Sequence, residues 1–429
     1  MRTTYTVRLS AVVLAVGMAL AGCSGTTAPS GAPASGGSGG AAKISGTLTF
    51  ANWQWLEPGR GDKILAAVKK YETKNPDAKV VKQEITRADY EKTISTQIGA
   101  GAGPDILIVP DPFFPELVAA GALEPVDDVV QAASGLRETN NNYKADGKQM
   151  SILWEAVPYA LVWNKALLEK AGVKPPTNVD ELAAAAKAIK DKTGKTGFIV
   201  RHQLNEESPW WSDYSNWVFG YGGAWSDGKA LTLNRQENID ALAALQKVYK
   251  SGGFGVGDDA STYRSKFAAG EVGMMIDNSS AALTVVSKAG GIKPTEIASA
   301  PLPFPKGGSA YAGFSIGINS QSKNKALAKD FLKWMLGSEA QSTMADALFP
   351  SGIATAAKPS DALTAQHPWT DGFYKQLENS SGVVIKGFEA STPQVRTIVL
   401  TEVARCLSTG TSPKEAMDAA QQKAASIKP

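Results

Sequence analysis

Hydrophobic and polar positions alternate with two different periods in the first part of the chain. Residues 46–50 alternate as a strand does and residues 78–82 are predicted as a second strand. Residues 63–71 and 90–98 instead repeat apolar side chains every three or four positions, as amphipathic helices do. Residues 105–109 form an apolar run typical of a strand covered on both faces of a parallel sheet. This order predicts a doubly wound α/β unit, in which ligands bind beyond the carboxyl ends of the strands.

A second block of strands and helices follows residue 161. Asn178 lies where it can cap a helix, and Glu181, three residues later, fits the pattern of a capping box. Further strands are predicted at residues 198–200, 274–276 and 314–318, and further helices at residues 325–336, 399–407 and 412–425. The chain shows no internal repeat. Its 429 residues exceed the size at which a single hydrophobic core stops growing, so two lobes are expected.

The first 42 residues are predicted to be an export signal and a tether. Arg2 and Arg8 precede an apolar stretch at residues 11–20 that is too short to span a bilayer. The stretch ends in Leu-Ala-Gly-Cys at residues 20–23, which resembles the bacterial lipobox. That resemblance implies a signal peptide at residues 1–22, cleavage before Cys23 and attachment of lipid to Cys23. The alternative is an ordinary secretory leader with an incidental cysteine.

The segment after Cys23 and the composition of the chain narrow the classes of function. Residues 23–42 are rich in Gly, Ser, Ala and Pro, which predicts a flexible tether. The chain has 44 basic and 41 acidic residues, a balance that argues against nucleic acid as a partner. Two cysteines and two histidines are too few for a disulfide framework and for most zinc or histidine-based catalytic sites, so we expect no metal and no cofactor. Cys406 lies on the apolar face of a predicted helix and is expected to be buried.

Five short segments, in this order, carry a family resemblance. They are Gly-Pro-Asp-Ile at 103–106, Ala-Gly-Ala-Leu-Glu-Pro at 120–125, Trp-Asn-Lys at 163–165 with Ala-Gly-Val-Lys-Pro-Pro at 171–176, Phe-Ala-Ala-Gly-Glu-Val-Gly-Met at 267–274, and the stretch 318–332. Together they resemble the extracellular solute-binding proteins of ABC importers, in the maltose-binding-like branch. The resemblance runs from about residue 45 to the end of the chain.

The resemblance implies a fold, a partner and a location. The fold is α/β, with two doubly wound lobes joined by a multi-crossing hinge, the type II arrangement of periplasmic binding proteins. One lobe would comprise residues 43–155 and 309–346, and the other residues 156–308 and 347–429. A monomer of this kind captures a small solute, here a mono- or oligosaccharide, in the cleft and closes around it. It then delivers the solute to transmembrane permease subunits from the outer face of the cytoplasmic membrane, where lipid on Cys23 would anchor it.

Candidate solute ligands follow from the chemistry of a sugar, which offers C–H faces to aromatic rings and hydroxyls to carboxylates, amides and guanidinium groups. Trp53 and Asp111 follow strands of the first lobe. The resemblance places the other candidates in the cleft of the second lobe or at the hinge: Trp210, Trp211 and Tyr214 in a polar stretch predicted as a loop, Trp225, Asp277, Ser280, Phe314 and Arg396. Ser280 stands where relatives often carry a tryptophan. Asp111 alternatively caps a helix that begins near Phe113.

Other functions remain as alternatives. The solute alternatives are a polyol, a sugar acid, a polyamine and a glycerol phosphodiester, and the same fold also serves as a ligand receptor for a membrane sensor. The segment Gly-Phe-Ser-Ile-Gly at 313–317 matches the G-x-S-x-G motif of hydrolases, but it continues as a strand where that motif needs a turn into a helix. Glu155, or Glu206 and Glu207 with Asp277, would supply the acids of a glycosidase, a remote alternative. We therefore predict a binding protein and no enzyme.

Overall fold

The computed structural model describes residues 44–57, 59–87 and 89–429, so the predicted signal peptide, Cys23 and the tether lie outside the described residues. The strands are β1 (Gly46–Ala51), β2 (Ala78–Gln83), β3 (Ile106–Pro110), β4 (Lys144–Ala145), β5 (Lys148–Gln149), β6 (Ile152–Asn164), β7 (Thr196–Ile199), β8 (Val272–Asn278), β9 (Ile297–Ala300), β10 (Ser309–Ile318) and β11 (Ser380–Ser381).

Helices connect these strands. The α-helices are α1 (Arg60–Lys74), α2 (Tyr90–Gly99), α3 (Phe114–Ala119), α4 (Asp127–Gln131), α5 (Lys165–Ala171), α6 (Val179–Thr193), α7 (Glu207–Gly220), α8 (Gln236–Tyr249), α9 (Ala260–Ala268), α10 (Ser279–Val286), α11 (Lys325–Met335), α12 (Ser338–Ala347), α13 (Asp361–Gln366), α14 (Asp371–Leu377), α15 (Thr392–Thr409) and α16 (Pro413–Lys423). Short 3₁₀ helices are η1 (Trp53–Leu56), η2 (Asp111–Phe113), η3 (Glu138–Tyr143), η4 (Leu204–Glu206) and η5 (Pro368–Thr370).

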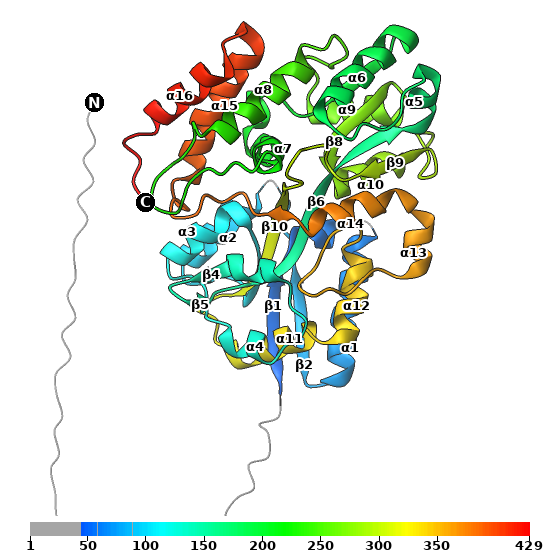
Figure 1. Ribbon diagram of the computed structural model, residues 1–429. Coiled ribbons are helices and arrows are strands. Elements are labelled where there is room, and N and C mark those ends of the chain that lie inside the picture. The colour runs from blue at the N-terminus through cyan, green and yellow to red at the C-terminus, as the bar shows by residue number, and fades with distance from the viewer. Residues whose placement is uncertain (1–43, 58, 88) are drawn as a thin grey trace, which may run out of the picture. The chain divides into compact units, whose positions relative to one another are not determined.

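The main sheet has the strand order β2-β1-β3-β10-β6-β8-β7 (Figure 1). β1 pairs in parallel with β2 and β3, and β7 pairs in parallel with β8, as the predicted strand–helix alternation requires. β10 and β6 lie between these two parallel groups and pair antiparallel with each other. The predicted α/β class is therefore confirmed, and the carboxyl ends of β1 and β3 lead into η1 and η2, where Trp53 and Asp111 lie.

The hydrophobic core is divided along β6. Ile152 to Ala156 of β6 belong to a first cluster, which also contains β1, β3, α1 and α11, whereas Tyr159 and Leu161 belong to a second cluster with α6, α7, α8 and α15. A smaller third cluster packs α9 and α10 on the other face of β8. Because a strand runs from one cluster into the next, the two halves in Figure 1 are joined by the sheet as well as by loops. The exact bounds of the two lobes stay a prediction.

Helix caps explain several boundaries. The Asn178 side chain accepts from the Glu181 amide at 2.9 Å, as predicted, but the Glu181 carboxylate accepts from the Thr177 amide instead of closing the box on Asn178. Ser412 and Glu415 form the complete capping box at the start of α16. The first turns of both helices thus have their otherwise unpaired amides satisfied by side chains.

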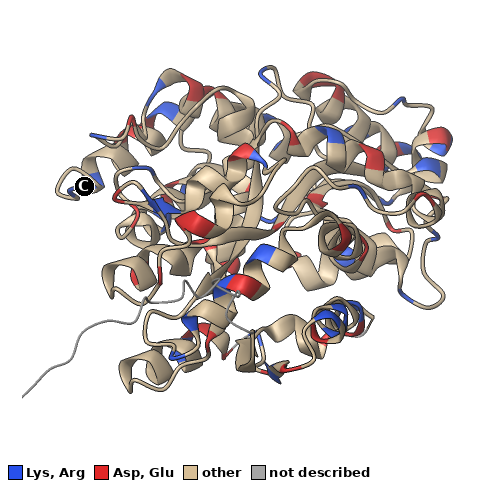
Figure 2. Cartoon of the chain, turned by 90° about the horizontal axis from the view of Figure 1, so that it is seen from below, with Lys and Arg blue, Asp and Glu red and all other residues tan. Residues whose placement is uncertain are grey.

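The described residues contain no helix long and apolar enough to cross a membrane, and no cluster of three or more His, Cys, Asp or Glu arranged for a metal ion. Basic and acidic residues are interspersed along the chain in the view of Figure 2. Arg60, for example, lies 3.4 Å from Glu57, and Lys329 lies 3.0 Å from Asp128. This mixing agrees with the near-neutral composition of the chain.

Cys406 is enclosed in the second cluster, and its thiol is expected to be unreactive. Gln246 Nε2 lies 3.1 Å from Sγ, and burial raises the pKa of the Cys406 thiol to about 11, so the nucleophilic thiolate is scarce at neutral pH. In a Cys23→Ser chain Cys406 is the only thiol. An aromatic disulfide reagent should leave that chain unmodified when folded and label one thiol in guanidinium chloride. Labelling at the denatured rate under native conditions would contradict the burial.

Candidate functional site

A large pocket, of about 1510 Å³, is bounded by residues of the first hydrophobic cluster and by the segment that contributes Val383, Ile385 and Phe388 to the second. One side is made by η2, α3, η3 and the β4–β5 hairpin, and the other by the chain between α14 and α15. The polar and charged side chains that line it are Asp111, Arg137, Glu138, Thr139, Asn141, Asn142, Tyr143, Lys144, Asp146, Glu378, Ser380, Ser381, Lys386 and Glu389. Its volume exceeds the roughly 300–1,000 Å³ usual for small-molecule sites, which leaves room for a solute of more than one ring.

Asp111 is the predicted ligand residue that lines this pocket. The buried strand β3 ends at Pro110, so η2 begins with Asp111 directly beyond the carboxyl end of that strand. The residue is only 5% exposed, and Tyr143 Oη donates a hydrogen bond of 2.8 Å to its Oδ1. Burial raises the pKa of Asp111 to about 7, although the bond from Tyr143 acts in the opposite direction. Neither η2 nor α3 has a side-chain cap, so the alternative role of Asp111 as a helix cap is wrong.

Two glycines allow the backbone to approach this carboxyl group. A Cβ atom on Gly313 of β10 would stand 2.2 Å from Asp111 Oδ2, far inside van der Waals contact. A Cβ atom on Gly382 would lie 3.3 Å from Tyr311 Oη and 3.6 Å from the same Asp111 oxygen. Asn142 Nδ2 completes the group by donating to Tyr311 Oη at 2.6 Å. Tyrosine hydroxyls, an amide and a carboxyl group therefore converge at one end of the pocket.

Trp53 and Phe314 lie beside Asp111 in the first half of the molecule. Phe314 is opposite Pro110 in the β10–β3 register, and its ring centroid lies 5.2 Å from that of Trp53. The Arg87 guanidinium stands 4.9 Å from the Trp53 ring centroid, a cation–π distance, and the ring is 6% exposed. The structure thus brings together three candidates, of which Trp53 and Phe314 are 261 positions apart in the sequence (314 − 53), but it leaves Trp53 largely covered.

The aromatic candidates of the second half lie in a helix, so their predicted loop placement is wrong. Residues 207–220 form α7, whose Trp210, Trp211 and Tyr214 are each 2% exposed or less. Trp211 stacks on Trp225 with ring centroids 4.3 Å apart and donates from Nε1 to the Val383 carbonyl at 2.9 Å. α7 is buried around most of its circumference, and its buried residues include polar ones such as Ser212, Asp213 and Asn216, so its sequence lacks the amphipathic period that marks a surface helix. Contact of these rings with a solute stays a prediction.

Asp277 and Arg396 are held by ion pairs. Asp277 accepts from Arg264 Nε and Nη2 at 2.7 Å each and from Tyr263 Oη at 3.0 Å. Burial favours the neutral acid, but the arginines and these hydrogen bonds outweigh it and hold the pKa of Asp277 below its ordinary value. Ser280 Oγ, nearby in sequence, is buried and finds no hydrogen-bond partner among the described residues. Arg396 Nε donates to Glu207 at 2.9 Å.

The carboxylates considered for a glycosidase are likewise occupied. Glu206 accepts from Arg201 at 3.1 Å, and Glu207 pairs with Arg396 as above. Glu155 is fully buried between Gln54 Nε2 and Ser351 Oγ, each at 2.6 Å, with Arg60 at 3.3 Å. The G-x-S-x-G segment is part of strand β10, as expected, and Ser315 Oγ accepts from Ser151. In this arrangement these side chains have structural partners.

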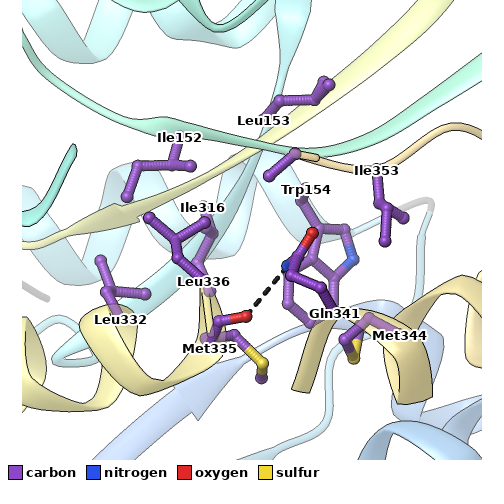
Figure 3. A pocket seen from close by; sticks show the side chains of 11 residues that line it. Ile152, Leu153, Trp154, Ile316, Leu332, Met335, Leu336, Gln341, Met344 and Ile353 are labelled. Atoms are coloured by element: carbon purple, nitrogen blue, oxygen red, sulfur yellow. Dashed lines mark hydrogen bonds between the residues drawn. The ribbon is translucent and has the colours of Figure 1, made fainter. Parts of the chain in front are cut away.

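A second, much smaller cavity lies inside the first cluster. Its volume is about 10 Å³, near the minimum for a single water molecule. Figure 3 shows apolar side chains such as Ile152, Ile316 and Leu332 converging on it, while Gln341 Nε2 donates to the Met335 carbonyl at 2.9 Å. It is a packing void and has no room for a solute.

Several pocket residues were missed by sequence reasoning. Tyr143 and Asn142 end a polar run, Thr-Asn-Asn-Asn-Tyr at residues 139–143, which is a signal that a search for polar loops between strands would have found. The opposite wall begins with a similar polar run, Glu-Asn-Ser-Ser-Gly at residues 378–382, but nothing in that run indicates that it faces the first one. It reaches the pocket only because β11 pairs with the start of β10, about 70 residues earlier in the chain.

Comparisons with known proteins agree with this architecture. Residues 56–342 match the family model described as bacterial extracellular solute-binding protein. Curated relatives include the sn-glycerol-3-phosphate-binding periplasmic protein UgpB of Shigella dysenteriae, 26% identical over 243 residues, and that of Escherichia coli K12, also 26% identical over 243 residues. Each alignment covers 53% of this chain and 55% of the relative, so the chain spans about half the length of the curated relatives it matches.

Solved structures match over nearly the whole described body. The GacH receptor of Streptomyces glaucescens, solved unliganded and with acarbose, has a TM-score of 0.75 at 22% identity, covering 90% of this chain and 98% of the receptor. The cyclic α-maltosyl-1,6-maltose binding protein of Arthrobacter globiformis has a TM-score of 0.76 at 20% identity, covering 89% and 99%. At these identities the likeness establishes the fold, which is that of type II periplasmic binding proteins. Since the family model also matches 287 of the 429 residues, the chain belongs to the bacterial extracellular solute-binding protein family.

Proposed function

We propose that the protein captures a sugar outside the cell and delivers it to the permease subunits of an ABC importer. The observation that carries the proposal is the pocket of about 1510 Å³, with hydroxyl, amide, carboxyl and cationic groups on its walls. Such groups match the hydroxyls of a saccharide. The structural relatives support the choice of solute, because one of them was solved in complex with acarbose and the other is a cyclic α-maltosyl-1,6-maltose binding protein.

Binding at this position would couple to closure of the two halves. A solute that touches both the α3–η3 wall and the wall between α14 and α15 gains all its contacts only when the walls are close together. Of the candidate ligands, Asp111 stands directly on the pocket. Trp53 and Phe314 lie beside Asp111. The buried Trp210, Trp211, Tyr214, Trp225 and Asp277 would take part only after a rearrangement that exposes them, and the partly exposed Ser280 and Arg396 do not line the pocket.

A thermal-shift screen of the purified chain against a carbohydrate library tests this function. A solute that binds the native state raises the melting temperature, by mass action, and the best ligand should also reduce the radius of gyration in small-angle scattering. The sugar should be recovered unchanged after incubation. Chemical conversion of the sugar by the protein alone would instead indicate an enzyme, and no response to any carbohydrate would refute the choice of solute.

The curated relatives favour a second candidate solute. Their names describe binding of sn-glycerol-3-phosphate, and Arg137, Lys144 and Lys386 on the pocket walls are the side chains able to pair with a phosphate. The screen therefore includes this compound. A stronger response to it than to every saccharide would replace the sugar in the proposal and leave the capture function intact.

We also propose that the mature protein is anchored by lipid on Cys23, outside the described residues. The support is the Leu-Ala-Gly-Cys quartet at residues 20–23 behind a basic and apolar leader. Mass spectrometry of the native protein should find a diacylglyceryl group on Cys23, and Cys23→Ser should move the protein from the membrane to the soluble fraction. Cys406→Ser serves as the matched control and should remain membrane-bound. Retention of the Cys23→Ser protein at the membrane would refute the anchor.

A further inference from the structure

Asp111 is a buried carboxyl group without a cation beside it. Although 95% of its surface is covered, no arginine, lysine or histidine forms an ion pair with it among the described residues. The other buried aspartates at the carboxyl ends of strands or on α7 are paired differently, because Asp277 has Arg264 and Asp213 has Arg201. Burying an unpaired carboxylate is costly, and proteins retain such a group mainly where something else supplies the missing charge.

The free side of this carboxyl group faces the pocket. Tyr143 donates to Oδ1, whereas no hydrogen bond from a described residue reaches Oδ2. Oδ2 lies between the backbones of Gly313 and Gly382, and Gly382 itself lines the pocket with Asp111. Gly313 thus lets the backbone of β10 pack against the carboxyl group, and Oδ2, which no described residue bonds, is the oxygen that Asp111 leaves to a solute in the pocket.

The charged side chains that line the pocket, Asp111 included, are acidic in excess. Five acidic and three basic residues line the pocket. The basic ones are engaged elsewhere or lie apart from Asp111: Arg137 donates from Nε to the Thr355 carbonyl at 2.9 Å, and Lys144 donates to Asn141 at 2.8 Å. The pocket as a whole thus attracts a cation more than an anion.

We infer that the solute, on the proposed function a sugar, carries a protonated amine, and that this ammonium group binds Oδ2 of Asp111. An amino sugar of one or two rings has the required chemistry, since it presents hydroxyls to polar pocket side chains such as Asn141 and Asn142 and a cation to the carboxylate. A neutral sugar would leave the buried charge unpaired, and a phosphate would add a second negative charge beside it.

Isothermal titration of the purified full chain with three disaccharides of similar skeleton tests the inference. They are the glucosamine dimer, its N,N′-diacetyl form and cellobiose, and sn-glycerol-3-phosphate is the anionic probe. We expect the amine to bind at least about tenfold more tightly than the two neutral compounds at pH 7.5. The Asp111→Asn variant should lose about 30-fold or more in affinity for the amine and little for the neutral compounds.

Asp240→Asn is the matched control, because it removes the same charge from an exposed position on α8, where the Gln236 amide bond to the side-chain oxygen can persist. It should keep the preference for the amine. The preference should also weaken as the pH falls below the pKa of Asp111, which is about 7. Other titratable groups lie near Asp111 and can influence its titration. Tyr143 and Tyr311 stand beside the carboxyl group, and the walls carry Arg137, Glu138, Lys144, Asp146, Glu378, Lys386 and Glu389.

The outcomes separate the two proposals. Equal or tighter binding of cellobiose or of the acetylated dimer would overturn the inference and leave sugar capture standing. Tightest binding of sn-glycerol-3-phosphate would overturn the inference together with the sugar as solute. An amine preference that survives Asp111→Asn unchanged would show that another group binds the cation, which also overturns the assignment to Asp111.

Discussion

Replacing Asp111 with asparagine should make the unliganded protein more stable at pH 8, although the same change removes the group proposed to bind the solute. The folded-state pKa of Asp111 is raised by burial from 3.8 to about 7. At pH 8 the carboxyl group of Asp111 is therefore ionised in the native protein. Ionisation costs more free energy there than in the unfolded chain, where the carboxylate is exposed to water. At about 1.36 kcal/mol per pKa unit the penalty is at most about 4 kcal/mol, and asparagine does not incur it.

The stability difference between the Asp111→Asn variant and the parent should depend on pH. A group with a raised folded-state pKa contributes no penalty below its unfolded value, near pH 4, and the penalty grows as the pH rises from 4 to 7. Urea unfolding of parent and variant should therefore show equal stability near pH 4 and a variant that is more stable by about 1–4 kcal/mol at pH 8. The Tyr143 hydroxyl keeps an acceptor in the asparagine oxygen, so the geometry is preserved. A variant less stable than the parent at pH 8 would show that Asp111 supports the fold.

Stability lost to an unpaired charge in the unliganded state is consistent with a binding site. The Asp111→Ala variant tests the binding role more severely than Asp111→Asn does, because alanine removes the hydrogen-bond acceptor as well as the charge. Loss of a desolvated acceptor at the centre of a binding site commonly costs about 2–4 kcal/mol, or about 30- to 1000-fold in affinity. The stability measurement needs no ligand, so it can be made before the solute is known.

Part of the site could be predicted from sequence because the strand pattern positions it. Asp111 follows an apolar run of five residues in β3, and in a doubly wound sheet the residue after such a strand lies on the ligand-binding edge. Trp53 follows β1 for the same reason, and the two do lie on neighbouring strands. The pairing of β10 with β3, which brings Phe314 beside Trp53, is a contact between distant segments, and the family resemblance implies only that residue 314 lies at a hinge crossing.

The rest of the site depends on contacts that a periodic pattern does not encode. Tyr311 and Asn142 meet across 169 residues, and the Trp211 indole reaches the Val383 carbonyl across 172. Local pattern is also misleading in α7, where a polar stretch that begins at Glu206 predicts a loop although the chain is helical. In the structure the side chains of Ser212, Asp213 and Ser215 are buried, and Asp213 pairs with Arg201. These polar residues therefore lie on buried faces of the helix and do not mark a loop.

Truncating Trp211 to alanine should strongly destabilise the protein because its ring is part of the second hydrophobic cluster. The indole is 2% exposed, stacks on Trp225 at 4.3 Å and donates to the Val383 carbonyl. Removing a buried tryptophan of this kind typically costs about 3–5 kcal/mol, and the carbonyl also loses its donor. Since Val383 belongs to the segment that forms one wall of the pocket, the change should loosen that wall as well.

Urea unfolding followed by circular dichroism measures this loss, with Trp334→Ala as the matched comparison because its half-buried ring packs at the edge of the first cluster. The midpoint of Trp211→Ala should fall well below that of Trp334→Ala, and Trp211→Phe should recover part of the loss by restoring a ring against Trp225. The sequence prediction that Trp211 is a sugar platform leads to the opposite result. A Trp211→Ala protein as stable as the parent, but with its affinity for the best solute lost, would place this indole on the solute and require α7 to expose it when the pocket opens.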